Sequence, residues 1–169
     1  GDGSIHNTLG FTSADKEIVD AVDSTLRKDW DLCLHHTGKG SEFVYGICNK
    51  DLEMSNSRKE ASLFKKAISE LYLNVTSEKK FIPEIYKFSS YENRLALIQG
   101  LMDTDGTASG IKISKFSGKE IGGKCSFTSV SKQLADDVAF VLRSLGCSVT
   151  IQASTKNPKY KYSYKGVEE

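Results

Sequence analysis

Two carboxylates stand at the end of one predicted helix, where they would suit a divalent cation. Asp103 and Asp105 follow a segment with apolar residues at helical spacing, and Gly106 comes directly after them. Acids at the C-terminus of a helix are unfavourable by about a few tenths of a kcal/mol, because that end already carries partial negative charge. A bound cation reverses the sign of this effect. A solvated turn closed by Gly106 is the alternative, and an EF-hand is excluded because the loop lacks the required glycine and glutamate.

The same predicted helix carries two small residues on one face. Ala96 and Gly100 lie four residues apart, a spacing that allows another backbone to approach closely. A glycine inside a helix is less favourable than alanine by about 1 kcal/mol. We therefore expect close packing at this face to compensate.

The lysines form a second group of candidate functional residues. The net charge of +1 combines −4 over residues 1–105, +7 over residues 106–165 and −2 from Glu168 and Glu169. A basic second part indicates a polyanionic partner. In residues 111–128 and 159–165, lysines and hydroxyl residues alternate with apolar ones, and period two predicts that the lysines share one face. A solvated face and the protection of edge strands from pairing are the alternatives.

Two segments of the chain are similar at a shift of 116 residues, with eight identities over positions 11–27. Phe11-Thr12-Ser13 recurs as Phe127-Thr128-Ser129. An Asp-Gly-hydroxyl triplet precedes each copy, as Asp2-Gly3-Ser4 and as Asp105-Gly106-Thr107. The second copy has a longer gap, residues 112–124, which we interpret as an enlarged hairpin. Two landmarks in the same order favour a duplicated unit over chance similarity.

The apolar patterns predict which elements position these groups. Ser13 and Ser89 are the expected N-caps of two helices, the second of which reaches about Asp103. Further helices are expected at 63–71 and 131–145, and strands at 8–12, 32–36, 43–48, from 147 and at 159–165. Each half then has strand, strand, helix, strand, strand, helix. Antiparallel hairpins that alternate with helices indicate an α+β fold.

The composition excludes several classes of protein. The chain has 169 residues, 38% hydrophobic and 27% charged, the balance of a soluble globular protein. No apolar run reaches the roughly 18 residues of a membrane span, and nothing at the start resembles a secretory leader. The segment Cys33 to His36 lacks the spacing of zinc ligands. Buried free thiols in a reducing cell interior are expected at Cys48, Cys125 and Cys147.

Residues 98–106, Ile-Gln-Gly-Leu-Met-Asp-Thr-Asp-Gly, resemble the LAGLIDADG motif of homing endonucleases, particularly the dodecapeptide type found inside inteins. Gly1-Asp2-Gly3-Ser4 resembles the tail of a first copy of that motif, and Phe81-Ile82-Pro83 and the Phe-Thr-Ser helix openings are also similar to intein endonucleases. The resemblance covers nearly the whole chain. It implies two pseudo-symmetric αββαββα halves whose antiparallel sheets form a DNA-binding saddle. The first motif helix would be missing and the last strand cut short, as in a truncated piece of a larger protein.

The resemblance also implies a catalytic site at the seam between the two motif helices. Asp2 and Asp105, the last acid of each motif, would meet there and hold Mg²⁺ or Mn²⁺, because close carboxylates repel each other unless cations lie between them. The metals would activate a water and stabilise the leaving oxygen, so that each aspartate serves one DNA strand. Lys50 matches by position a basic residue that family members carry after the fourth strand of a half.

Double-stranded DNA is the partner that the resemblance implies for the basic strands and hairpin turns. Lysines would contact phosphates, and hydroxyl residues would read base edges in the major groove. The implied DNA-binding residues are Lys39, Lys112, Lys115, Lys119, Lys124, Ser126, Thr128, Lys156, Lys159, Lys161 and Lys165.

The leading hypothesis is therefore a metal-dependent endonuclease for a specific DNA site, in an intein-containing chain of the cell interior. The first half would cover 1–73, a connection 74–90 and the second half 91–169, together a pseudo-dimeric monomer. A non-cleaving relic of the family or an intron maturase is the alternative, although a binding protein has no need of both Asp2 and Asp105. Protein splicing is not indicated, because the sequence shows neither a nucleophile at its start nor a final His-Asn.

Overall fold

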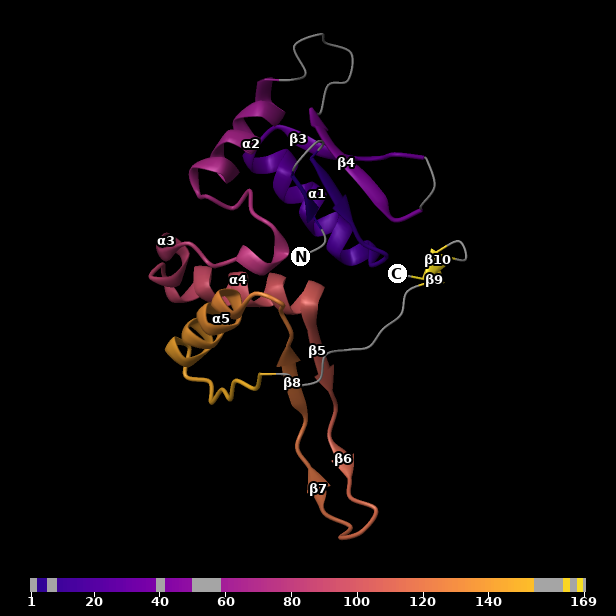
Figure 1. Cartoon of the computed structure of the whole chain (residues 1–169), viewed down its shortest axis with the longest axis vertical. Helices are drawn as coiled ribbons and strands as arrows, with labels where there is room; N and C mark the ends of the chain where they lie inside the picture. The colour runs from indigo at the N-terminus through magenta and orange to yellow at the C-terminus, as the bar shows by residue number, and fades with distance from the viewer. Residues whose placement is uncertain are drawn as a thin grey trace.

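The computed structural model describes residues 3–5, 9–38, 42–49, 59–153, 163–164 and 167–168. Its helices and antiparallel strands confirm the predicted α+β class, and they fall into two groups along the chain (Figure 1). The first group is β1 (Gly3–Ser4), β2 (Gly10–Thr12), α1 (Lys16–Asp29), β3 (Leu32–His36), β4 (Val44–Asn49) and α2 (Lys59–Glu70). The second is η1 (Ser77–Lys79), α3 (Glu84–Lys87), α4 (Tyr91–Asp105), β5 (Gly106–Ser109), β6 (Lys112–Ile113), β7 (Glu120–Ile121), β8 (Lys124–Phe127), α5 (Lys132–Ser144), β9 (Ser163–Tyr164) and β10 (Val167–Glu168). Among the described segments, no helix has the length and apolar character needed to cross a membrane.

The first group forms one antiparallel sheet in the order β1, β2, β4, β3. The predicted hairpin of β3 and β4 is confirmed, with Cys33 opposite Cys48. α1 packs on β3 and α2 packs on β4, and Leu26 of α1 and Leu32 of β3 are buried. The apolar stripe of α1 thus covers the sheet, as its helical spacing requires.

Asp23 links α1 to the edge of this sheet. Its carboxylate accepts hydrogen bonds from the backbone N–H of Leu34 at 2.7 Å and from Nε of Arg27 at 2.6 Å. Partial burial opposes the negative charge, but these donors outweigh it, so the pKa of Asp23 lies below its ordinary value. The ionised carboxylate therefore stabilises the contact between helix and strand.

The main apolar core lies between α4, α5 and the segment that precedes them. It joins Ile82, Ile98, Leu134, Val138 and Val141, all of them buried. Leu134, Val138 and Val141 lie on α5, whose bounds agree closely with the predicted helix 131–145. The partly buried side chains around this core are Leu97, Leu101, Met102, Phe127, Leu142 and Leu145.

The segment expected to connect two halves is held against α5 by a buried carboxylate. Asp137 accepts hydrogen bonds from the backbone N–H of Ile82 at 2.9 Å, Nζ of Lys87 at 3.0 Å and Nε2 of Gln133 at 3.0 Å. The side chains of Lys87 and Asp137 are only 17% and 5% exposed. Three donors satisfy this carboxylate, so the connection packs as part of the second group.

Two helix N-caps differ from the prediction. α1 is capped by Asp15 rather than Ser13, and α4 by Ser90 rather than Ser89. The hydroxyl of Ser13 accepts from the N–H of Asp15, and the hydroxyl of Ser89 donates to the carbonyl of Tyr86. Both serines therefore form local turns just before the helix instead of capping it.

Several local contacts recur in the two similar segments at a shift of 116 residues, except that the two glycines are 103 residues apart. In each copy of the similar segment, a serine precedes the N-cap and accepts a hydrogen bond from its N–H, a lysine pairs with an aspartate one turn on, and a glycine lies opposite a strand phenylalanine. These contacts are Ser13 with Asp15 and Ser129 with Ser131, Lys16 with Asp20 and Lys132 with Asp136, and Gly3 with Phe11 and Gly106 with Phe127.

Ala96 and Gly100 are exposed, and no described atom lies within 4 Å of a Cβ built at Gly100. The first motif helix, which is expected to pack there, is not among the described residues, so close packing at this face stays a prediction. Two other expectations are wrong. Cys125 and Cys147 are exposed rather than buried. Residues 147–153 form no strand, because the ladder partner that a strand needs is not found among the described segments.

We predict that Asp137→Ala lowers the free energy of unfolding by about 3 kcal/mol, because it leaves Lys87 and the N–H of Ile82 without their buried acceptor. The matched control is Asp136→Ala, which removes an ion pair at the surface and changes stability by less than about 1 kcal/mol. Urea unfolding of both variants measures the difference. Equal losses would show that the buried contacts of Asp137 carry no special weight.

Candidate nucleic-acid interface and acidic site

Asp105 is the last residue of α4 and directly precedes β5, so it lies where the helix meets the base of a long hairpin. It is half-buried, whereas Asp103 is exposed. The backbone N–H of Gly106 closes the helix by donating to the carbonyl of Met102. The two carboxylates at the helix end therefore differ in exposure, and Asp105 is the one that directly precedes the strand.

Gly106 is required by the close approach of the strand to the helix. A Cβ at this position would lie 2.4 Å from the carbonyl oxygen and 2.6 Å from the Cε of Met102. Any side chain would therefore force the junction to open. The glycine that follows Asp105 sets the direction in which the chain leaves the helix.

The donors available for a metal at this junction are carboxylate oxygens. The described residues contain no group of three or more His, Cys, Asp or Glu side chains that would hold a metal ion. Mg²⁺ does not require one, since it is usually bound by one or two carboxylates with waters and substrate phosphates. Asp105 is a donor of this type. Asp2 and Lys50, the other expected catalytic residues, lie outside the described residues.

β5 and β8 bring expected DNA-binding residues onto one face. Lys124 lies opposite Ser109, and Ser126 lies opposite Thr107. Residues directly opposite each other in antiparallel strands project to the same side. Phe127 projects to the other side and packs against the core, so the exposed side chains of Lys124 and Ser126 point away from it. This part of the predicted polar face is present.

Thr107 is a further candidate, which was not predicted from the sequence. It is exposed on the same face as Ser126, and the alternation of residues 106–109 is the signal that would have found it. Ser109 differs, because its hydroxyl donates to the carbonyl of Lys124 at 3.2 Å and accepts from the N–H of that residue at 3.3 Å. Thr128, which was expected to contact DNA, is exposed just after β8.

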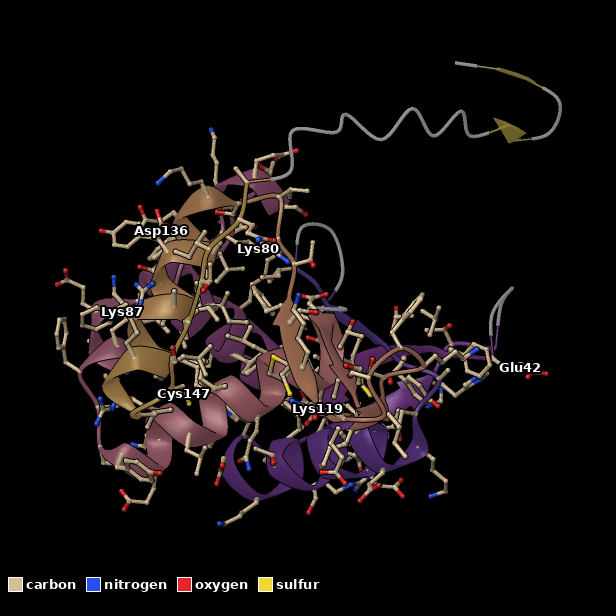
Figure 2. All side chains as sticks on the ribbon, turned by 90° about the horizontal axis from the view of Figure 1, so that it is seen from below. Glu42, Lys80, Lys87, Lys119, Asp136 and Cys147 are labelled. Carbon is tan, nitrogen blue, oxygen red and sulfur yellow. The ribbon has the colours of Figure 1, made fainter. Side chains whose placement is uncertain are left out.

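The hairpin continues through β6 and β7 and extends away from the helices (Figure 1). Lys115 and Lys119 are exposed at its far end. Figure 2 shows Lys119 set apart from Lys87 and Asp136, which lie beside α5. The backbone of Lys112 pairs with that of Ile121, and its side chain lies outside the described part of the structure.

Five further lysines expected to bind DNA lie outside the described residues. They are Lys39, Lys156, Lys159, Lys161 and Lys165.

The histidines and cysteines of the first sheet have structural contacts. Nε2 of His36 lies 3.0 Å from the carbonyl of Glu42, and its Nδ1 accepts from the N–H of Gly38 at 3.2 Å. The sulfurs of Cys33 and Cys48 are 3.7 Å apart, and burial together with the neighbouring Cys33 raises the pKa of Cys48 to about 11. The Cys48 thiol therefore stays protonated near neutral pH.

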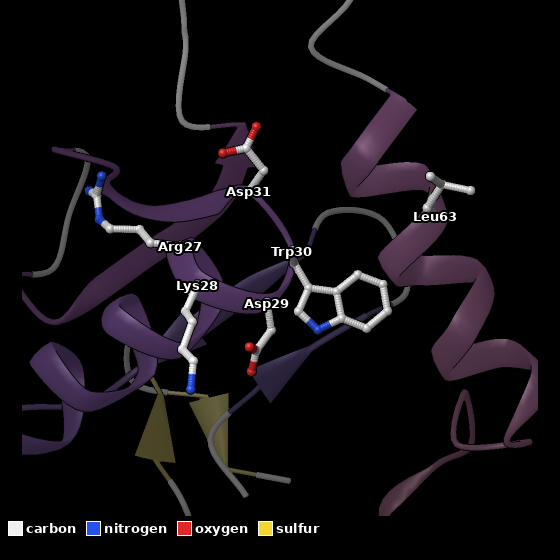
Figure 3. Close-up of a pocket in the computed structure, with 6 residues that line it drawn as sticks. All are labelled: Arg27, Lys28, Asp29, Trp30, Asp31 and Leu63. Atoms are coloured by element: carbon white, nitrogen blue, oxygen red, sulfur yellow. The ribbon is translucent and has the colours of Figure 1, made fainter.

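A pocket of about 410 Å³ lies elsewhere, between the end of α1 and α2 (Figure 3). Trp30 lines it and packs edge-on against Phe64, with ring centroids 4.9 Å apart. The other lining residues include two acids and two bases, so the pocket has no consistent charge for an anionic or cationic ligand. We assign it no chemistry. Its lining residues are Arg27, Lys28, Asp29, Trp30, Asp31 and Leu63.

Comparison with known families identifies the second part of the chain. Residues 92–168 match the family model described as a LAGLIDADG-like domain. This region, which contains α4, the long hairpin and α5, is therefore a LAGLIDADG-like domain, as the motif at 98–106 predicted. Such a domain indicates the family of homing endonucleases and maturases. The comparison with curated proteins gave no match, and neither did the comparison with solved structures.

We predict opposite effects for two glycine substitutions in this domain. Gly106→Ala lowers the free energy of unfolding by about 1–3 kcal/mol, because its Cβ clashes with Met102. Gly100→Ala raises it by about 1 kcal/mol, because alanine favours the helix and the new methyl group meets open space. Thermal and urea unfolding measure both. Destabilisation by Gly100→Ala would mean that another backbone packs on this face of α4.

Proposed function

We propose that this chain is a divalent-metal-dependent endonuclease that cuts a specific site in double-stranded DNA. One observation carries the proposal: Asp105 and the basic hairpin are adjacent within a single LAGLIDADG-like domain. A carboxylate fixed at the base of a cationic strand pair suits a substrate that is itself a chain of phosphates. The charge of the hairpin supports this, since residues 106–128 contain four lysines and one acid.

The lysines and the hydroxyl residues of the hairpin have separate roles in this proposal. Lys115, Lys119 and Lys124 contact phosphates and supply affinity that does not depend on sequence. Thr107 and Ser126 face the bases from the same side of the ladder as Lys124. The methyl group of Thr107 and the hydroxyl groups of Thr107 and Ser126 would each give a modest preference for particular bases. The duplex then lies along the polar face of β5 and β8, with its backbone near Asp105.

Asp105 serves as a ligand for a divalent cation in this site. Its carboxylate and the phosphate of the substrate form the oxygen donor set that Mg²⁺ or Mn²⁺ accepts. When bound, the cation supplies activation of water and stabilisation of the leaving oxygen. The role of the chain is to hold the carboxylate in one place, and the close backbone junction at Gly106, next to Asp105, supports this role.

We further propose that the chain contains two related halves, at 1–73 and 91–169, joined by 74–90. The contacts that recur 116 residues apart support a duplicated unit. Asp2 is then the counterpart of Asp105, and Lys50 assists it. The remaining basic residues contribute to the same DNA surface, and the two halves act as a pseudo-dimeric monomer. The motif type and Phe81-Ile82-Pro83 favour an intein-containing protein of the cell interior.

Asp105→Asn is expected to reduce DNA cleavage by about a hundredfold or more in Mg²⁺, because it removes a charged metal ligand. Binding to DNA should persist, since the lysines are unchanged. The substrate is a duplex recovered by binding from a random-sequence library, and the matched control is Asp103→Asn, which alters the exposed carboxylate two residues away.

Two results would decide against this assignment. Undiminished cutting by Asp105→Asn would remove Asp105 from the site. Tight binding without any cutting in Mg²⁺ or Mn²⁺ would favour the alternative, a non-cleaving relic or maturase of the same family.

Binding to duplex DNA should weaken steeply with salt, because each phosphate contact releases counterions. Lys119→Ala and Lys124→Ala should each reduce the slope of log Kd against log salt by about one. Lys132→Ala is the control, because this exposed lysine on α5 pairs with Asp136 away from the hairpin. Fluorescence anisotropy at several salt concentrations gives the slopes. If all three variants reduced the slope equally, the proposal that the hairpin forms the DNA-binding surface would be contradicted.

A further inference from the structure

The tip of the long hairpin displays a large apolar side chain. Phe116 has a relative exposure of 104%, the highest of the exposed large hydrophobic residues in the described structure. Ile113 and Ile111 behind it are 70% and 68% exposed. Isolated apolar residues are common on protein surfaces, so exposure alone assigns no role. The setting of this phenylalanine is what distinguishes it.

The turn that carries Phe116 is closed by its own hydrogen bonds. The hydroxyl of Ser114 accepts from the N–H of Phe116 at 3.3 Å and of Ser117 at 3.2 Å. The N–H of Gly118 donates to the carbonyl of Ser114 at 2.9 Å, and the N–H of Ser114 donates to Lys119 at 2.8 Å. Gly118 adopts a φ of +63°, which glycine accepts readily. The backbone that carries the ring is therefore already ordered by these hydrogen bonds, which lowers the entropic cost of binding.

Phe116 stands between two lysines along the turn. Lys115 precedes it and Lys119 follows three residues later, both are exposed, and neither forms an ion pair with another described residue. Two cations beside one ring match a DNA groove, where phosphates line the rim and bases form the floor. A self-associating surface would instead bring four lysines together, which like-charge repulsion disfavours. The charge pattern therefore favours DNA over a second copy of the chain.

The shape of the hairpin selects the groove. A two-stranded ribbon fits the major groove of B-DNA, and the minor groove is about half as wide. The apolar feature of the major-groove floor is the C5 methyl group of thymine, which phenylalanine contacts favourably. The reach of the hairpin beyond the helices places the tip away from the base, where Asp105 lies (Figure 1).

We propose that Phe116 is a specificity-determining residue that contacts a thymine methyl group in the major groove, at a distance from the cleavage position. Lys115 and Lys119 hold the phosphates on either side of that base. The inference rests on the proposed function, because it assumes that the hairpin binds duplex DNA. It adds a base preference that the lysine face alone does not provide.

The test compares DNA ligands that differ by one methyl group. Duplexes that bind the wild-type chain are selected from a random library, and Phe116→Ala is put through the same selection. We expect one position enriched in thymine for the wild type and not for Phe116→Ala. Replacing that thymine by deoxyuridine should raise the Kd of the wild type about fourfold, the effect of one buried methyl group, and leave Phe116→Ala unchanged.

Two further variants keep the result interpretable. Phe116→Leu retains an apolar side chain and should keep part of the thymine preference. Ile85→Ala removes an exposed apolar residue of α3 and should have no effect on selection. Thermal unfolding checks that all variants are folded. We expect no loss of stability from the changes at Phe116, because its side chain is fully exposed.

The possible outcomes separate the inference from the function on which it rests. Equal affinity for thymine and deoxyuridine at every position, with salt-sensitive binding intact, overturns the role of Phe116 and leaves the proposed function standing. Absence of salt-sensitive DNA binding by the wild type overturns both. A shift from dimer to monomer in Phe116→Ala, measured by size-exclusion chromatography, assigns the ring to self-association and also overturns the inference.

Discussion

The junction between α4 and β5 is the constraint on which the arrangement of the candidate site depends. The carbonyl of Met102 accepts the N–H of Gly106, and the same oxygen would lie only 2.4 Å from any Cβ at that position. Glycine is therefore the residue that lets a strand leave the helix so closely. Asp105 belongs to the helix and Thr107 to the strand, so this one contact sets the acid and the polar face in a fixed relation. A looser turn would separate them.

The junction is itself held by packing behind it. Ile98 of α4 is buried with Val138 and Val141 of α5, and Phe127 of β8 packs against the same core. Asp137 adds the preceding segment to this frame through Ile82 and Lys87. The LAGLIDADG-like domain at 92–168 is thus supported by residues just before it. With the rest of the described structure the hairpin tip makes no comparable contacts, so its order depends on the hydrogen bonds of its own turn.

Local patterns predicted the elements well wherever the deciding contacts are close in sequence. The apolar stripe of α5 is one example, since Leu134, Val138 and Val141 follow helical spacing and are buried together. The hairpin of β3 and β4 is another, because alternating residues flank a glycine turn. The motif at 98–106 correctly identified the family of the second part of the chain.

Predictions were less accurate where a distant partner decides the outcome. Asp136 and Asp137 are neighbours of the same type, yet only Asp137 is buried, because a segment more than 50 residues earlier supplies its donors. The N-caps of α1 and α4 were misplaced by one or two residues, since Ser13 and Ser89 had an equally good local acceptor or donor. The small residues Ala96 and Gly100 on one face of α4 did not indicate which element would pack there. Among the described residues, no atom lies within 4 Å of a Cβ built at Gly100. Spacing identifies a face, but only the partner shows what covers it.

Paramagnetic broadening by Mn²⁺ tests most directly whether the end of α4 binds a cation beside DNA. Amide signals of the chain are recorded by NMR with a selected duplex, before and after substoichiometric Mn²⁺. We predict that the signals of Gly106 and Thr107 broaden first, and that Asp105→Asn removes the effect. Broadening centred on another acidic site, such as Glu120 at the far end of the hairpin, would contradict it.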